Sequence, residues 1–252
     1  MNVLSGFADI SFWQLVPVAV VALFASIVGG VSGYGTGALM PLVLVPLVGA
    51  EPVVPIIAIS AMFTNSSRVF AFLNYADWRR AAIVLAASVP TCVLGAWGYT
   101  LLSSTGAALV IGGMLVASVP LRRMLRHRGF KVSDGGLGLG ALGYGLVVGG
   151  TAGSGVILLS LLMAAGVEGA GVIATDAAIS IVIGIVKISV FGLVGVITAQ
   201  VIAFALLIGV VALPGAFLAK AFVERMPVHV HTAILDVVVL LGGVFLIYSA
   251  LR

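Results

Sequence analysis

Two basic residues, Arg68 and Lys187, lie inside apolar segments that are long enough to cross a lipid bilayer. Burying a cation at the middle of a membrane helix costs at least about 2.5–3.5 kcal/mol. The two residues are 119 positions apart, and each is followed four residues later by a phenylalanine, Phe72 or Phe191. Two cations at such related positions indicate a pathway for an anion. The alternative is that each long side chain reaches back to the membrane surface.

One carboxylate, Asp176, shares the apolar segment of Lys187. It precedes Lys187 by 11 residues, close to three helical turns, so both side chains are expected on one face of a helix. A carboxylate at such a depth is a candidate for carrying a coupled proton. The alternative is a structural role in which Asp176 neutralises Lys187. No cluster of histidine, cysteine and carboxylate residues has the spacing of metal ligands, and no catalytic motif is present, so we expect no metal site, no cofactor and no enzyme activity.

Two glycine-rich stretches occupy related positions, at 28–37 and 148–155. Each glycine in a helix costs about 1 kcal/mol relative to alanine, so such clusters predict an unwound or tightly packed backbone. Freed backbone N–H groups at these breaks could bind anion oxygens. The expected substrate-binding residues of the two stretches are Gly30, Ser32, Gly33, Tyr34, Gly35, Thr36, Gly150, Gly153, Ser154 and Gly155. The alternative is that these glycines serve helix packing alone.

The composition predicts an integral membrane protein. Of 252 residues, 62% are hydrophobic and 8% are charged, whereas a soluble domain carries roughly 25% charged residues. The net charge of +4 comes from a few loop clusters and gives no indication of nucleic-acid binding. The single cysteine, Cys92, excludes an internal disulfide. We therefore expect an all-α polytopic fold whose main partner is the lipid bilayer.

The apolar segments fall into two halves, 1–121 and 135–252, joined by a basic cytoplasmic linker at 122–134. Each half begins with a glycine-interrupted segment, 12–49 or 135–166. A continuous helix over 12–49 would be about 57 Å long, too long for a membrane core of about 30 Å. The sequence thus predicts two repeats, each with a hairpin of broken or short helices followed by three full transmembrane helices.

The repeats are expected to be inverted, because each would contain an odd number of full crossings. With the N-terminus outside, this arrangement puts nine basic residues in cytoplasmic loops and at cytoplasmic helix ends, and one outside. The alternative treats each interrupted segment as one crossing, which gives eight parallel spans with eight basic residues inside and two outside. The length of 12–49 favours the inverted version, which is a common transporter architecture.

The chain resembles the TauE/SafE family of membrane permeases. The resemblance is carried by GGVSGYGTGALMPLVL at 29–44, by GGTAGSGVILLSLL at 149–162, by the basic central loop and by Pro214-Gly215-Ala216. It implies a two-repeat polytopic fold, no prosthetic group, and export of sulfite or organosulfonates. The second stretch has Val156 where the first has Thr36, and it lacks a counterpart of Pro41. The two halves are therefore expected to contribute unequally to a site.

These observations predict a secondary transporter of small anions, most plausibly sulfite or organosulfonates, that works by alternating access between the two repeats. Its partners would be a small sulfur-containing anion and the lipids of a bacterial cytoplasmic (inner) membrane; a homo-oligomer is also compatible with the sequence. Two alternatives stay open at this point. A passive anion channel would use the same residues without coupling, and a non-transporting membrane scaffold would not need the two buried cations.

Overall fold

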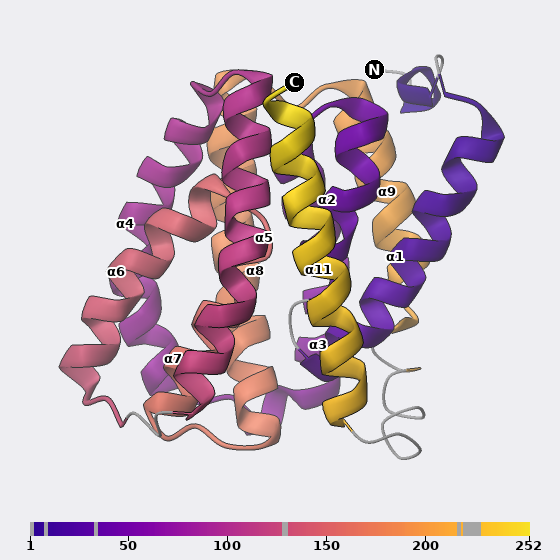
Figure 1. Ribbon diagram of the computed structural model, residues 1–252. Helices are drawn as coiled ribbons and strands as arrows, with labels where there is room; N and C mark the ends of the chain where they lie inside the picture. The colour runs from indigo at the N-terminus through magenta and orange to yellow at the C-terminus, as the bar shows by residue number, and fades with distance from the viewer. Residues whose placement is uncertain (1–2, 8–9, 33–34, 128–130, 216–217, 219–227) are drawn as a thin grey trace.

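In the computed structural model the chain folds into helices that run up and down between two opposite faces (Figure 1). The structure describes residues 3–7, 10–32, 35–127, 131–215, 218 and 228–252. Within these ranges there are helices and no strands, which confirms an all-α fold. The helices are α1 (Phe12–Ser32), α2 (Gly35–Val48), α3 (Val53–Phe72), α4 (Trp78–Thr100), α5 (Ser104–His127), α6 (Asp134–Gly150), α7 (Gly155–Ala164), α8 (Ala170–Val194), α9 (Ala199–Ala212) and α11 (Val228–Ala250), with short 3-10 helices η1 (Val3–Phe7) and η2 (Leu73–Tyr75).

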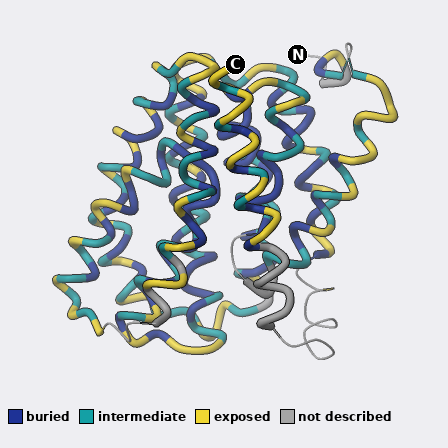
Figure 2. The backbone as a smooth tube through the Cα atoms, in the orientation of Figure 1, coloured by how far each residue is buried: buried dark blue, intermediate teal, exposed yellow. Residues whose placement is uncertain are grey.

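Five of the described helices are long and apolar enough to cross a membrane, namely α1, α3, α4, α5 and α8. The outer surface carries large apolar side chains on many helices, among them Trp13, Phe24, Trp97, Leu139 and Phe245. Figure 2 shows exposed stretches along the outer helices of the bundle and buried stretches interspersed with them. A surface of this kind suits lipid rather than water, which confirms a polytopic membrane protein.

Capping side chains fix several helix starts. The Asp77 carboxylate accepts a hydrogen bond from the backbone N–H of Arg80 and begins α4. Ser133 and Thr198 do the same for α6 and α9. Because Asp77 caps α4, this helix begins at Trp78. Helix α5 continues to His127, so the first residues of the expected linker at 122–134 are helical.

Both glycine-interrupted segments fold back on themselves. Helices α1 and α2 pack against each other, as do α6 and α7, so neither segment is one continuous helix. Figure 1 shows the open end of the α1–α2 hairpin on the face that carries both termini, and the open end of the α6–α7 hairpin on the opposite face. A hydrogen bond from Val132 N to Ala164 O, 2.8 Å long, closes the second hairpin at that end.

The helix pairs occur in matched sets. Helix α3 packs against α8, and α5 packs against α11. Helix α4 packs against α6 and α8, while α9 packs against α1 and α3; α5 contacts α7, while α11 contacts α2. These sets are the ones expected if α1 to α5 correspond in order to α6, α7, α8, α9 and α11. The division of the chain into two repeats stays a prediction, and this packing supports it.

Candidate functional site

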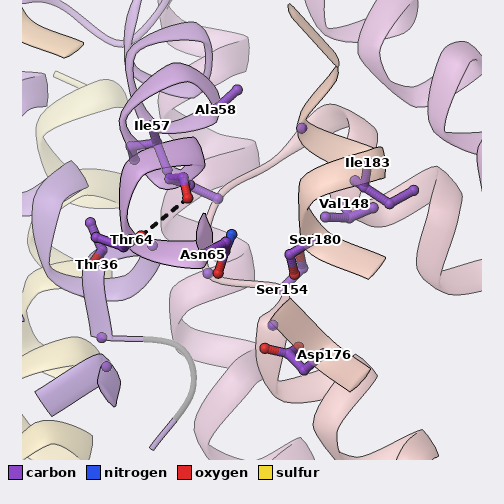
Figure 3. Close-up of a pocket in the computed structure, with 18 of the residues that line it drawn as sticks. Thr36, Ile57, Ala58, Thr64, Asn65, Val148, Ser154, Asp176, Ser180 and Ile183 are labelled. Atoms are coloured by element: carbon purple, nitrogen blue, oxygen red, sulfur yellow. Dashed lines mark hydrogen bonds between the residues drawn. The ribbon is translucent and has the colours of Figure 1, made fainter. Parts of the chain in front are cut away.

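A cavity of about 140 Å³ lies at the centre of the bundle, between both hairpins and the α3–α8 pair. A single water molecule needs roughly a tenth of that volume, so the cavity has room for a small hydrated ion. Figure 3 shows Thr64 and Asn65 of α3 on one side of this space, and Ser180 of α8 with Ser154 on the other. The remaining polar or charged lining residues are Ser26, Thr36, Arg68, Tyr144, Thr151, Asp176 and Lys187.

Two helices begin at this cavity. Helix α2 starts at Gly35 and α7 starts at Gly155, and both residues line the space. The first N–H groups of a helix have no partner within it, and a helix N-terminus carries about half a positive charge. Two such ends facing one polar cavity offer backbone donors to an anion from both hairpins.

The two glycine stretches touch each other at the cavity. A Cβ atom on Gly37 would lie 3.0 Å from the backbone N of Gly153, so a side chain there would require this backbone to shift by a few tenths of an ångström. Gly153 itself has φ of +83°, a left-handed conformation that other residues adopt at a cost. The turn before α7 and the first turn of α2 therefore depend on glycine for their close approach.

Arg68 makes an ion pair across the α3–α8 contact. Its Nη2 donates to Asp176 Oδ2 at 2.9 Å, and its Nη1 donates to Asn65 Oδ1 at 3.1 Å. The Arg68 and Asp176 side chains are 7% and 2% exposed, so the pair is removed from solvent and lipid. Arg68 Nε and Asp176 Oδ1 are buried without a hydrogen-bond partner. Arg68 thus reaches sideways into the protein instead of toward the membrane surface, and it keeps a donor that its present contacts do not use.

Lys187 contacts the C-terminal end of α6, in contrast to the helix N-termini of α2 and α7 at the same cavity. Its ammonium donates to Val148 O at 2.7 Å and to Thr151 O at 3.2 Å, at the point where α6 ends inside the protein. The last carbonyls of a helix have no partner within it and carry partial negative charge. An ammonium has three N–H donors, so one remains for the cavity that Lys187 lines.

The cavity brings together most of the residues predicted from the sequence. Those that line it are Gly35, Thr36, Arg68, Gly153, Ser154, Gly155, Asp176 and Lys187. Gly150 instead approaches Gly95 of α4, where a Cβ would lie 3.1 Å from the Gly95 carbonyl oxygen. Gly30 and Ser32 belong to the last turn of α1. Gly33 and Tyr34 lie outside the described residues.

One sequence-based alternative was wrong. Asp176 was considered as a neutralising partner for Lys187 on its own helix, but its carboxylate pairs with Arg68 of α3, and Lys187 contacts backbone carbonyls instead. Spacing along one helix predicted a shared face correctly, since Asp176 and Lys187 both line the cavity. It could not predict which neighbouring helix would supply the closer cation.

The set of expected site residues did not include several polar residues of the cavity wall: Asn65, Thr64, Ser180, Tyr144 and Thr151. Asn65 precedes Arg68 by three residues, and Ser180 follows Asp176 by four, so helical spacing from the charged residues would have found both. Tyr144 is an aromatic hydroxyl within a glycine-rich apolar segment, which is a weaker signal. Together these side chains add hydrogen-bonding groups from α3, α8 and the α6 segment to the cavity lining.

No curated protein and no solved structure matches the chain. The family model described as "Sulfite exporter TauE/SafE" matches residues 18–246, which include both glycine stretches, both buried cations and Asp176. With a match over nearly its whole length, the chain belongs to the TauE/SafE sulfite exporter family of membrane transporters.

Proposed function

We propose that this protein is a secondary transporter of small anions, of the sulfite or organosulfonate class, and that the central cavity is its substrate site. The observation that carries the proposal is the convergence of two helix N-termini and two buried cations, Arg68 and Lys187, on one cavity. Family membership supports transport in general. The donors and positive charge around the cavity support an anion as the cargo.

The charge of the cavity suits a small, singly charged anion. Arg68, Lys187 and Asp176 sum to +1 when all three are ionised, and the ends of α2 and α7 add about half a charge each. The lining Asn65 amide and Ser180 hydroxyl can donate to sulfite or sulfonate oxygens, whereas the Thr64 hydroxyl donates to Ala61 O at 3.2 Å.

Asp176 is the candidate for proton coupling. Its carboxylate accepts a hydrogen bond from Arg68 Nη2 at 2.9 Å, and an anion would otherwise bind to this guanidinium nitrogen. Protonation of Asp176 would weaken that contact and free the guanidinium for the substrate, so proton and anion would bind together. The neutral Tyr144 hydroxyl also lines this part of the cavity and could stabilise either state.

Alternating access would follow from movement of one repeat against the other around the cavity. The Arg68–Asp176 pair crosses the α3–α8 contact and would be one of the contacts that such a movement changes. The proposed membrane is the bacterial cytoplasmic membrane, with the face that carries Arg79, Arg80 and Lys131 toward the cytoplasm.

The experiment that tests the proposal measures sulfite uptake by liposomes that contain the purified protein, in sodium-free buffer. Accumulation above equilibrium that depends on a pH gradient supports a coupled transporter, whereas flux that only follows the sulfite gradient supports a channel. Arg68→Ala combined with Lys187→Ala should abolish sulfite binding and flux. Arg79→Ala removes an exposed cation that pairs with Asp134 outside the cavity, and it should leave both unchanged. Full sulfite binding in the double variant would refute the two-cation site.

A further inference from the structure

Helix α6 presents the kind of site where membrane transporters often hold a coupling cation. It ends at Gly150 in the middle of the fold, and Thr151 continues as extended backbone. In transporters with broken helices, the carbonyl oxygens at an interior helix C-terminus commonly coordinate sodium. The carbonyls of Val148 and Thr151 lie at such an end, beside the central cavity.

In this protein a side chain already occupies the position. The Lys187 ammonium lies 2.7 Å from Val148 O and 3.2 Å from Thr151 O, and Lys187 is 6% exposed. An alkylammonium and a sodium ion are both monovalent cations that bind oxygen atoms. Lys187 thus supplies, from α8, the charge that the end of α6 would otherwise take from the solution.

The other half of the chain does not repeat this contact. Arg68 stands 119 residues before Lys187, but its guanidinium donates to Asp176 and Asn65. Among the described contacts, Lys187 therefore has a helix C-terminus as its partner and Arg68 does not. Arg68 is thus held by side chains across the α3–α8 contact, whereas Lys187 is held by the carbonyl end of α6.

We propose that the Lys187 ammonium is a tethered monovalent cation that replaces a coupling sodium ion at the C-terminal end of α6, so that the protein needs no alkali cation. A variant that removes the ammonium and leaves space should expose a binding site for sodium. The inference rests on the proposed transport function only where sulfite flux is the measurement. Sodium binding is measured without it.

The test compares thermal unfolding of the purified full chain in sodium chloride and in choline chloride at equal ionic strength. We expect the midpoint of the wild type to be the same in both salts. Lys187→Ala should unfold at a lower temperature than the wild type in choline, and its midpoint should rise with the logarithm of the sodium concentration. Equilibrium binding of radioactive sodium to this variant should saturate at one ion per chain.

Three variants make the result specific. Lys187→Ser also leaves space and offers a hydroxyl ligand, so it should gain the same sodium response. Lys187→Met removes the charge but fills the space, so its midpoint should be low in both salts. Arg68→Gln removes the other cavity cation and leaves the Lys187 contacts in place, so it should gain no sodium response.

The inference is overturned if Lys187→Ala and Lys187→Ser show no sodium-dependent stabilisation, if both fail to fold in either salt, or if the wild type responds to sodium as strongly as they do. Restored sulfite flux of Lys187→Ala in sodium would support both proposals. Sodium binding to that variant, with a wild type that moves no sulfite, would retain this inference and refute the proposed transport. Sulfite flux by the wild type, without any sodium response in the variants, would refute this inference and retain the proposed transport.

Discussion

Removal of the Asp176 carboxylate should destabilise the protein more than the loss of any single surface charge. The Arg68 guanidinium would remain buried, with the Asn65 amide oxygen as its remaining polar contact among those described. At 2.9 Å and an effective dielectric constant of about 20, the attraction within the present pair is about 6 kcal/mol. Much of that is offset by the desolvation of both ions, but removal of one partner of a buried pair still costs about 3–5 kcal/mol. Because Asn65 stays, we expect about 3 kcal/mol for Asp176→Ala.

The assay is the free energy of unfolding in mixed detergent micelles, measured for a double-mutant cycle. Asp176→Leu and Arg68→Leu should each be strongly destabilising, whereas the double variant should lie close to the wild type, because it leaves no buried charge. Arg79→Ala is the matched control. It breaks an ion pair with Asp134 whose side chains are 81% and 43% exposed, and it should cost less than about 1 kcal/mol.

Two results would refute this reasoning. One is a cost for Asp176→Ala as small as that of Arg79→Ala, which would mean that water or lipid headgroups reach Arg68. The other is a double variant as unstable as the sum of the two single variants, which would mean that Arg68 and Asp176 act through separate contacts.

Three further predictions concern the glycines and a helix cap. Gly153→Ala should lower stability by about 1–2 kcal/mol, because φ is +83° at this residue. Gly113→Ala should instead raise stability by up to about 1 kcal/mol, because Gly113 is helical and has open space around it. Thermal unfolding of both variants checks this prediction. Gly95→Ala should disrupt the α4–α6 contact, because its Cβ would meet the Leu146 carbonyl. Gly98, about one turn further along α4, has no neighbouring atom within reach of a Cβ, so Gly98→Ala is the control. Equal thermal unfolding midpoints for the two variants would contradict the packing. The pKa of Asp77 lies below its usual value of 3.8, chiefly because the carboxylate accepts the Arg80 N–H, so its stabilisation is present above that value and lost as pH falls through the lowered pKa. Asp77→Ala should therefore cost about 1 kcal/mol at neutral pH, and the gap to the wild type should close in acid; a gap that is constant with pH would argue against the cap.

Much of this fold follows from the sequence because lipid leaves few choices to a backbone. An apolar segment of about 20 residues must satisfy its own hydrogen bonds as a helix, and α8 at Ala170–Val194 is such a segment. The break between α1 and α2 was predictable for a similar reason, since 12–49 is too long for one crossing. Helix starts that are set by side-chain caps, such as the start of α4 at Asp77, are harder to predict, because apolar periodicity carries no information about a cap.

The contacts of the site were harder to predict than its members. Helical spacing places Asp176 and Lys187 on one face, yet the partner of each is chosen by the distance to a second helix. That distance depends on how closely α3 approaches α8 and on where α6 ends. Neither can be predicted from the sequence of a single helix. Gly150 is a further example: it resembles a cavity residue in sequence, but the close approach of α4 at Gly95 gives it a packing contact.

The different partners of Arg68 and Lys187 trace to a single position. Counting back 119 residues from Asp176, the spacing that relates Lys187 to Arg68, gives Ile57, an apolar residue of α3 that also lines the cavity. The first half therefore has no carboxylate at this place, and Asp176 of the second half lies 2.9 Å from Arg68. With that carboxylate committed to Arg68, Lys187 must find its oxygen ligands elsewhere, and the open carbonyls of α6 supply them. Two cations at related positions of the sequence can thus have different partners, because a single acidic residue at only one of the two related positions pairs with one of them.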